Sequence, residues 1–515
     1  MRHLILLAVF PALFACQPPK SQSAKADAAP EKAAVTEAPA EAPAEEWDVR
    51  DSLVRINSTQ QSWDVWQPWE KTPPERRRAL GAIVGPQLVV TTAELVANST
   101  YLEFESADGS RFAGAKVIIA DYEANLALLG PVSAKAGERF FAGTVPFEIA
   151  SPPAIGSTLD ILQLEDNGLP LITSGSLQSV DVMSNLMPGQ SFLTYLVKAS
   201  MRSVSSSYTL PVLHGRQLAG VLLSYNSKDQ VCDVVSTDIL KRFITEATNG
   251  KYDGFPGLGI STARTEDGQF RQWLGLGEEQ GGLYIRSVRK GGAADRAGVR
   301  KGDVLLAIDG QTIDRRGYYE HPLYGSLSWG HLIRGMKSGG DKVKLSLLRE
   351  GRPIAVEAVA EREDNEARLV PQHLFEKAPN YLIKGGMVFM ELSRPVLESF
   401  GEDWRSRAPL NLLDAFENPE NYEDSLDRVV FLSGAIPTPA TVGYERLRNL
   451  IVKKVNGVEI RSMKSLKDAF DNHSGEIHSI EFADENLTVH LDELVSSEVD
   501  SQLLKRGIPK LSRTE

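Results

Sequence analysis

The sequence predicts a mainly β chain in which a long region of short strands is followed by two smaller α+β units. Between residues 47 and 251, short apolar runs alternate with turn residues, which is typical of an all-β barrel or sandwich. Residues 254–361 then combine a glycine-rich loop, strands and a helix. The same plan returns in weaker form over residues 380–495, which indicates an internal duplication.

The first region begins with apolar segments that are short and regularly interrupted by turn residues. Residues 238–247 differ, because apolar side chains recur there at helical spacing, and we expect a helix that closes the region. The clearest strands of the region are residues 53–56, 81–84, 88–90, 100–104 and 117–119.

Each α+β unit is marked by a strand that ends in a turn dipeptide. In the first unit, a short helix around residues 294–297 ends at Gly298, and a strand at residues 304–308 precedes Asp309-Gly310. In the second unit, residues 452–455 precede Asn456-Gly457, and a helix is expected at residues 465–470.

The composition is that of an ordinary globular chain, and 515 residues leave room for about three domains. A formal net charge of -12 argues against nucleic acid as a partner, because phosphate binding requires a basic surface. The run Arg76-Arg77-Arg78 is a local exception, which we interpret as a solvated loop. Trp63, Trp66 and Trp69 are interpreted as packing residues in preference to a sugar-stacking site.

The N-terminus resembles the signal of a bacterial lipoprotein. A basic start is followed by an apolar stretch that is shorter than the roughly 20 residues needed to span a bilayer. The stretch ends in Leu13-Phe14-Ala15-Cys16, which resembles a lipobox, so Cys16 is expected to be lipidated. The residue after this cysteine is Gln17, not an aspartate, and by the same resemblance this implies anchoring in the outer membrane, facing the periplasm.

The expected organisation of the chain follows from these shifts in composition. Residues 17–46 are rich in Ala, Pro and Glu and predict a disordered tether, because this composition cannot bury a core. With Cys16 lipidated, Cys232 has no intrachain partner and is expected to be a small buried side chain. The expected parts are a signal peptide at 1–16, the tether at 17–46, the β region at 47–251 and the α+β units at 252–367 and 368–508.

Several motifs make the chain similar to the plant-type Deg/HtrA serine proteases, which have one protease domain and two PDZ domains. The resemblance implies a trypsin-like double β-barrel followed by two α+β PDZ domains. It also implies a homo-oligomer built on a trimer. The matching stretches include residues 89–96, 122–129, 197–211, 254–261, 385–390 and 443–447.

The resemblance places unusual residues at all three positions of the catalytic triad. Glu94 stands where the family has the base histidine, Asn125 where it has the orienting aspartate, and Tyr208 where it has the nucleophilic serine. A serine protease needs a hydroxyl beside a base of near-neutral pKa and a carboxylate that orients the base. After a shift of one residue, Ser207 is the only fallback nucleophile, and His214 is expected in a hairpin turn away from the base position.

We therefore expect a non-catalytic Deg/HtrA-like envelope lipoprotein that binds C-terminal peptides or misfolded proteins as a scaffold, holdase or adaptor. The first PDZ domain and the degenerate protease cleft are the expected binding surfaces. Two alternatives stay open, namely an endopeptidase of this type with an altered active site and a regulatory subunit of an active Deg protease. A glycosidase-like acid–base pair of Glu94 with Asp121 or Glu123 is disfavoured.

Peptide binding is expected mainly in the first PDZ domain. PDZ domains add an extended peptide to a sheet edge and receive its terminal carboxylate on a loop of backbone N–H groups. In the second PDZ domain, residues 385–388 match such a loop only loosely. No group of His, Cys and Asp has metal-ligand spacing, and no cofactor is expected. The residues assigned to the peptide site are Gly257, Leu258, Gly259, Ile260, Leu332 and Ile333.

Overall fold

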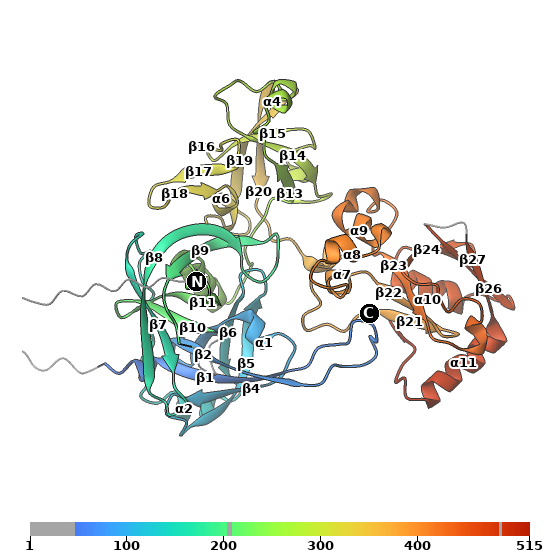
Figure 1. Ribbon diagram of the computed structural model, residues 1–515, viewed down its shortest axis with the longest axis horizontal. Helices are drawn as coiled ribbons and strands as arrows, with labels where there is room; N and C mark the ends of the chain where they lie inside the picture. The colour runs from blue at the N-terminus through green and yellow to red at the C-terminus, as the bar shows by residue number, and fades with distance from the viewer. Residues whose placement is uncertain (1–46, 203–208, 484–486, 515) are drawn as a thin grey trace, which may run out of the picture. The chain divides into compact units, whose positions relative to one another are not determined.

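The computed structural model describes residues 47–202, 209–483 and 487–514, and this part of the chain is mainly β, as predicted (Figure 1). Two closed six-stranded barrels come first, and two open sheets with flanking helices follow them along the chain. The architecture is therefore the expected double β-barrel with two α+β units after it.

The first barrel closes in the strand order β1-β2-β3-β6-β5-β4, with all neighbouring strands antiparallel. Bulges in several of the strand pairs increase the local bend, which helps a six-stranded sheet to curl into a barrel. Its core contains Ile56, Phe104 and Leu129. The elements are η1 (Val49–Ser52), β1 (Leu53–Gln60), β2 (Glu75–Gly85), β3 (Leu88–Thr91), α1 (Ala93–Val96), β4 (Ser99–Ser106), β5 (Phe112–Asp121), β6 (Leu126–Pro131) and α2 (Ala134–Phe140).

The second barrel has the order β10-β11-β12-β9-β8-β7 and is closed by pairing of β10 with β7. The helix predicted at residues 238–247 is present as α3 (Thr237–Thr248), which buries Ile239 and Phe243. Cys232 is buried, as expected, and its burial raises the pKa of the thiol to about 12. The strands are β7 (Thr158–Leu164), β8 (Pro170–Ser184), β9 (Ser191–Lys198), β10 (Leu210–His214), β11 (Gln217–Asn226) and β12 (Val231–Val235).

The first α+β unit is a sheet in the order β13-β14-β15-β19-β20. The turn after β15 is the predicted one, because Asp309 and Gly310 have φ values of 48° and 84°, as a tight type I′ hairpin requires. Within the described residues β13 pairs only with β14, so its other edge is free. The elements are β13 (Ile260–Ala263), α4 (Gly268–Leu274), β14 (Leu283–Val288), α5 (Ala293–Arg296), β15 (Val304–Ile308), β16 (Gln311–Thr312), β17 (Tyr318–His321), β18 (Gly325–Ser328), α6 (Gly330–Arg334), β19 (Lys342–Arg349) and β20 (Arg352–Val359).

The second α+β unit repeats the strand, turn and helix of the first. Asn456 and Gly457 form the predicted turn with φ values of 52° and 80°, and the helix predicted at residues 465–470 extends over Met463–Asp471. The sheet order is β27-β26-β24-β23-β22-β21-β28. The main elements are β21 (Tyr381–Lys384), β22 (Met387–Glu391), α7 (Arg394–Glu398), α8 (Trp404–Arg407), α9 (Leu410–Glu417), β23 (Val430–Ala435), β24 (Leu450–Val455), β25 (Val458–Glu459), α10 (Met463–Asp471), β26 (Ile477–Phe482), β27 (Thr488–Asp492), α11 (Glu493–Lys505) and β28 (Ser512–Arg513), with short helices η2 (Asn365–Ala367), η3 (Pro419–Asn421) and η4 (Pro439–Thr441).

The loop between β1 and β2 carries the three tryptophans, and they pack on the second α+β unit. Trp69 is part of that unit's core, with its ring centroid 5.8 Å from that of Tyr381. The guanidinium of Arg513 lies 4.3 Å from the ring centroid of Trp63. Trp66 meets Phe400 edge-on at 5.5 Å. All three are packing residues, as interpreted from the sequence.

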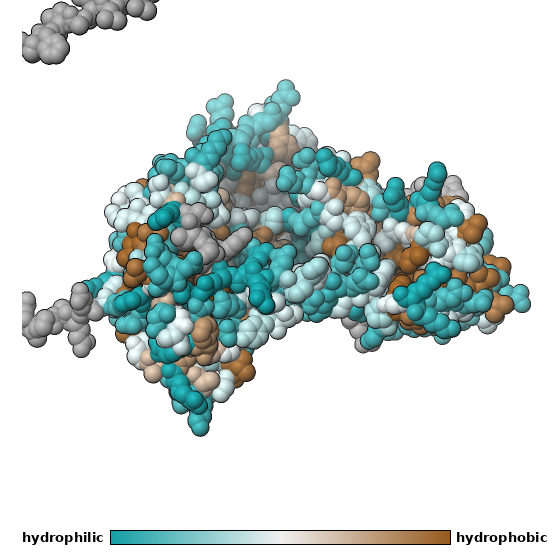
Figure 2. Space-filling view, turned by 60° about the horizontal axis from the view of Figure 1, so that its bottom comes forward, coloured by the Kyte–Doolittle hydropathy of each residue, from teal (hydrophilic) through white to brown (hydrophobic). Residues whose placement is uncertain are grey.

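The visible face of the molecule is mostly hydrophilic, with hydrophobic residues gathered in small groups (Figure 2). Within the described ranges, no helix combines the length and the apolar character that a membrane crossing needs. The predicted signal peptide, Cys16 and the tether fall within residues 1–46, outside the described residues.

Candidate functional site

Glu94, which the sequence resemblance aligns with the triad base, lies at the start of α1, and Asn125, which it aligns with the orienting aspartate, lies opposite. The side-chain oxygen of Asn125 accepts a hydrogen bond from the backbone N–H of Glu94, at 2.9 Å. Asn125 is buried and has a φ of 56°, a left-handed conformation that asparagine tolerates better than most residues. Asn125 therefore orients the backbone of the base position and presents no carboxylate to it.

The side chain of Glu94 is held by a cation. Its carboxylate forms an ion pair with Arg77 at 3.1 Å, and 43% of the side chain is exposed. Arg77 belongs to β2, and Arg78 in the same strand pairs with Glu105. The sequence-based interpretation of residues 76–78 as a solvated loop was therefore wrong, because all three lie in a barrel strand and two of them have acidic partners.

The two barrels meet beside this position through a pair of buried threonines. The hydroxyls of Thr92, just before α1, and Thr209, just before β10, are 2.6 Å apart. Together with Arg77, Glu94, Leu95 and Leu223 they line a space of only about 10 Å³. Tyr208 and the fallback nucleophile Ser207 lie outside the described residues. His214 ends β10 at an exposed hairpin turn, as expected.

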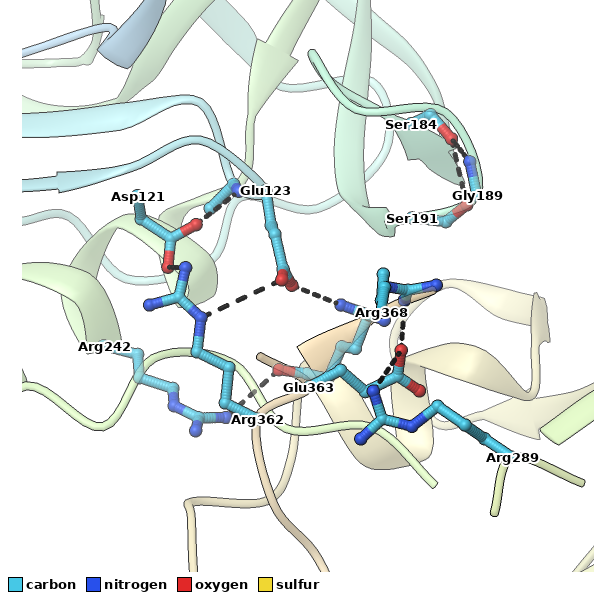
Figure 3. A network of polar contacts seen from close by, with 12 residues as sticks. Asp121, Glu123, Ser184, Gly189, Ser191, Arg242, Arg289, Arg362, Glu363 and Arg368 are labelled. Atoms are coloured by element: carbon cyan, nitrogen blue, oxygen red, sulfur yellow. Dashed lines mark hydrogen bonds and ion pairs between the residues drawn. The ribbon is translucent and has the colours of Figure 1, made fainter. Parts of the chain in front are cut away.

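The acidic residues considered as partners of Glu94 are engaged elsewhere (Figure 3). Asp121 accepts a hydrogen bond from Tyr252 at 2.6 Å and lies 3.4 Å from a guanidinium nitrogen of Arg362. Glu123 pairs with Arg334 at 3.0 Å and is buried, and its burial raises its pKa against the opposing effect of Arg334. These carboxylates connect the barrel to the first α+β unit and to the segment that follows it, and they form no acid–base pair with Glu94.

The predicted carboxylate loop of the first α+β unit has the backbone geometry to receive an anion. The carbonyl of Leu258 accepts from Ala294 at 3.0 Å, and the carbonyl of Gly259 accepts from Arg289 at 2.8 Å. Because the C=O and N–H of a trans peptide point in opposite directions, the N–H groups of Gly259 and Ile260 face away from α5 and β14. Gly259 has a φ of 71°, a conformation that glycine adopts without strain.

A cavity of about 400 Å³ lies beside this loop. Its lining includes Gly257, Leu258, Gly259 and Ile260, and Ile333 of α6, together with residues of the β8–β9 turn such as Gln190 and of the second α+β unit such as Phe416. Leu332 is buried but is not part of the lining, since successive residues of a helix point about 100° apart. The structure thus brings five of the six predicted peptide-site residues to one cavity.

Arginines surround the cavity, and sequence reasoning missed them. Arg289, Arg334 and Arg368 contribute to its lining, and so does Glu363. These residues come from β14's end, from α6 and from the segment after β20, so no short motif joins them. Within the described residues, no cluster of His, Cys, Asp and Glu is suited to hold a metal ion.

The loosely matching loop of the second α+β unit is a hairpin turn. Gly385 and Gly386 join β21 to β22, with Lys384 paired to Met387. The N–H of Gly385 donates to the carboxylate of Asp500 at 2.7 Å. Because β21 and β23 flank β22 on both sides, a peptide has no free edge of β22 to join.

Comparisons with known proteins report the same modules. Models of the PDZ domain match residues 284–319 and 370–510. The chain is 26% identical over 425 residues to Protease Do-like 4, mitochondrial, of Arabidopsis thaliana, covering 81% of this chain and 76% of that one. It is 24% identical over 465 residues to Protease Do-like 2, chloroplastic, of the same plant, covering 89% and 74%. Among solved structures, the HtrA-type protease AlgW with decapeptide is similar at 16% identity and a TM-score of 0.46, over 61% of this chain and 97% of that one.

A trypsin-like double β-barrel followed by two PDZ domains defines a class of serine protease homologues that carry their own peptide-binding modules. The similarity to the Do-like proteases extends over most of the chain, so the chain resembles the Deg/HtrA proteases in both its barrels and its PDZ domains.

Proposed function

We propose that this chain is a non-catalytic Deg/HtrA homologue that binds the C-terminal segments of other proteins in its first PDZ domain. The observation that carries the loss of catalysis is the state of the base position, where the Glu94 carboxylate is paired with Arg77. A carboxylate is a far weaker base than an imidazole, and this one is engaged in an ion pair with Arg77, so Glu94 is unsuited to deprotonate a serine or tyrosine hydroxyl.

The loop and cavity of the first PDZ domain support the peptide-binding part of the proposal. A peptide that joins the free edge of β13 would place its terminal carboxylate at the N–H groups of Gly259 and Ile260. Its last side chain would contact Leu258, Ile260 and Ile333. The cavity of the first PDZ domain, of about 400 Å³, is the main binding surface in this proposal, and the degenerate protease cleft is a second one.

The proposed cellular location depends on sequence features that lie outside the described residues. The proposal includes a lipid anchor at Cys16 in the outer membrane of a bacterial envelope, with the 17–46 tether holding the domains in the periplasm. Homo-oligomers built on a trimer and clients that are unfolded envelope proteins belong to the same proposal, since the family resemblance implies them.

Casein hydrolysis by residues 17–515 tests the loss of catalysis. The expected result is no turnover above that of the Ser207→Ala and Tyr208→Ala variants, with an active Deg protease as positive control. Turnover that Ser207→Ala abolishes would establish the alternative, an endopeptidase with an altered site. Co-purification with a catalytically complete Deg protease, combined with a change in that protease's rate, would favour the regulatory-subunit alternative.

Peptide binding is tested with a set of fluorescein-labelled decapeptides that differ only in their last residue, each made with a free and with an amidated C-terminus. Fluorescence anisotropy is expected to show binding of the free-carboxylate form for an apolar last residue. Gly259→Asp should abolish this binding, because it adds a carboxylate and strain at a φ of 71°. Gly351→Asp is the matched control, since Gly351 has a φ of 74° in the β19–β20 turn with open space around it. Unchanged binding by the Gly259→Asp variant would contradict the loop assignment.

A further inference from the structure

The segment that follows β20 runs back along the carboxylate loop of the first PDZ domain. The N–H of Gly257 donates to the carbonyl of Glu361 at 2.8 Å, and the Glu361 carboxylate pairs with Arg296 at 2.5 Å. These contacts fix the segment beside the loop. Two residues further on, the side chain of Glu363 reaches the side of the loop that lines the cavity.

The Glu363 carboxylate lies against the two loop glycines, beside the side chains of Arg289 and Arg334. Its Oε1 lies 3.5 Å from the place where a Cβ on Gly259 would be and 3.7 Å from the corresponding place on Gly257. Both separations are ordinary van der Waals contacts. Only 13% of the Glu363 side chain is exposed, so this is a seated carboxylate and not a freely solvated one.

Two arginines hold the carboxylate in place (Figure 3). Arg368 forms an ion pair with Glu363, and Arg289 lies 4.0 Å away on the other side. The Nε and Nη1 atoms of Arg289 are buried and have no hydrogen-bond partner among the described residues. The site therefore holds one carboxylate and has unused donors for an anion that approaches more closely.

We propose that Glu363 is an internal substitute for a ligand's terminal carboxylate, which an incoming peptide must displace from the Gly257–Gly259 loop. This inference rests on the proposed function, because it assumes that the first PDZ domain binds C-terminal peptides. A peptide carboxylate and Glu363 compete for the same arginines and the same loop, so they cannot occupy it together. The apparent affinity for peptide is then the intrinsic affinity of the empty loop multiplied by the fraction of molecules in which Glu363 has left the loop.

The segment that carries Glu363 also contacts the barrel, through the residue before Glu363. Arg362 faces the barrel, where it pairs with Asp121 at 3.4 Å and approaches Glu123 at 3.8 Å. Glu363 faces the PDZ loop from the next position on the chain. Adjacent residues of this segment therefore contact the barrel and the PDZ loop.

The test measures binding of the free-carboxylate and amidated decapeptides by wild-type protein and by Glu363→Gln and Glu363→Asp variants. Glu363→Gln keeps the side-chain volume and removes the charge, and it is expected to tighten binding of the free-carboxylate peptide about 3- to 5-fold, the worth of an ion pair of up to about 1 kcal/mol. Glu363→Asp keeps the charge but withdraws the carboxylate, so an intermediate increase is expected. The amidated peptide should gain nothing from either change.

Glu357→Gln is the matched control, because it makes the same change in charge within the same unit, at the exposed pair with Lys342. It should leave peptide affinity within twofold of wild type. If the wild type binds the free-carboxylate peptide and Glu363→Gln binds it equally or more weakly, Glu363 is a scaffold residue and the inference is wrong. If neither wild type nor any Glu363 variant binds a free-carboxylate peptide, the proposed function of the PDZ domain itself fails.

Discussion

The side-chain oxygen of Asn125 lies 2.9 Å from the backbone nitrogen of Glu94 and accepts its hydrogen bond. Of the two tasks that fall to a triad aspartate, this contact performs the structural one, which is to fix the loop that carries the base. The side chain of Glu94 itself is paired with Arg77. The contact between Asn125 and the backbone of Glu94 is therefore structural.

Substitutions at Asn125 should separate its hydrogen bond from its backbone conformation. Asn125→Gly keeps the left-handed φ of 56° accessible but removes the acceptor, and we expect a loss of about 1–2 kcal/mol in the free energy of unfolding. Asn125→Ala adds the cost of that φ for a residue with a Cβ, for a total loss of about 2–3 kcal/mol. Urea unfolding of the three proteins provides the comparison.

Asn125→Asp serves as the control for the same site, because aspartate keeps the acceptor and tolerates the same conformation. Its stability should fall within about 1 kcal/mol of wild type. Equal stability of the Gly and wild-type proteins would show that the bond to Glu94 contributes nothing and would remove the structural role assigned to Asn125.

The hydrogen bond between Thr92 and Thr209 predicts strong coupling between the two barrels. Either Thr92→Val or Thr209→Val leaves one buried hydroxyl without a partner, which should cost about 1–3 kcal/mol. The double variant removes both hydroxyls and should cost clearly less than the sum of the single changes, with a coupling energy of about 1–2 kcal/mol. A double-mutant cycle on the free energy of unfolding measures this, and strict additivity would mean that the 2.6 Å contact does not stabilise the protein.

Local patterns in the sequence were sufficient to predict much of the fold. The Asp309-Gly310 and Asn456-Gly457 turns were predictable because both positions of each dipeptide need a positive φ, which these residue types favour. Helix α3 was predictable from the spacing of Ile239, Leu240 and Phe243. The glycines at positions 257 and 259 were recognisable in the sequence because they lie in one continuous stretch of chain.

No local pattern in the sequence predicted the contacts between distant parts of the chain. The arginines at residues 77, 289 and 368 each find an acidic partner 5 or more positions away, and nothing in a strand or loop pattern specifies which. The Gly385-Gly386 pair, only a loose match to a ligand loop, forms a hairpin turn in which the N–H of Gly385 donates to Asp500. Sequence spacing identifies where a backbone can bend, but not which side chain arrives there.

The packing of the loop between β1 and β2 predicts that Trp69 contributes far more to stability than Trp66 does. Trp69 is 9% exposed and lies in the core of the second PDZ domain, so Trp69→Ala should cost about 3–5 kcal/mol. Trp66 is 39% exposed, and Trp66→Ala should cost about 1 kcal/mol or less. Urea unfolding and the rate of limited proteolysis in residues 61–74 measure both effects, and equal sensitivity of the two variants would contradict the packing described for Trp69.

Burial of His331 in the first PDZ domain predicts a loss of stability in mild acid. Burial lowers the pKa of His331 to about 4, whereas an unfolded histidine titrates near 6.5. Between these values the unfolded chain binds a proton that the folded chain does not, so stability falls as the pH falls through this window. The expected contribution of His331 is a loss of about 2 kcal/mol between pH 7 and pH 5. His373, whose pKa burial also lowers to about 4, adds a loss of the same sign.

His331→Phe removes the titrating group and keeps an aromatic ring, which in the wild type stacks on Tyr319 at 6.4 Å between centroids. The variant should therefore lose about 2 kcal/mol less than wild type on going from pH 7 to pH 5, because only the remaining histidines still contribute. His214→Asn, which removes a histidine from an exposed hairpin, is the control variant. The free energy of unfolding in urea, measured at pH 7 and pH 5, provides the test. An equal decrease in this free energy in the His331→Phe variant and the wild type would show that His331 is protonated in the folded protein at pH 5.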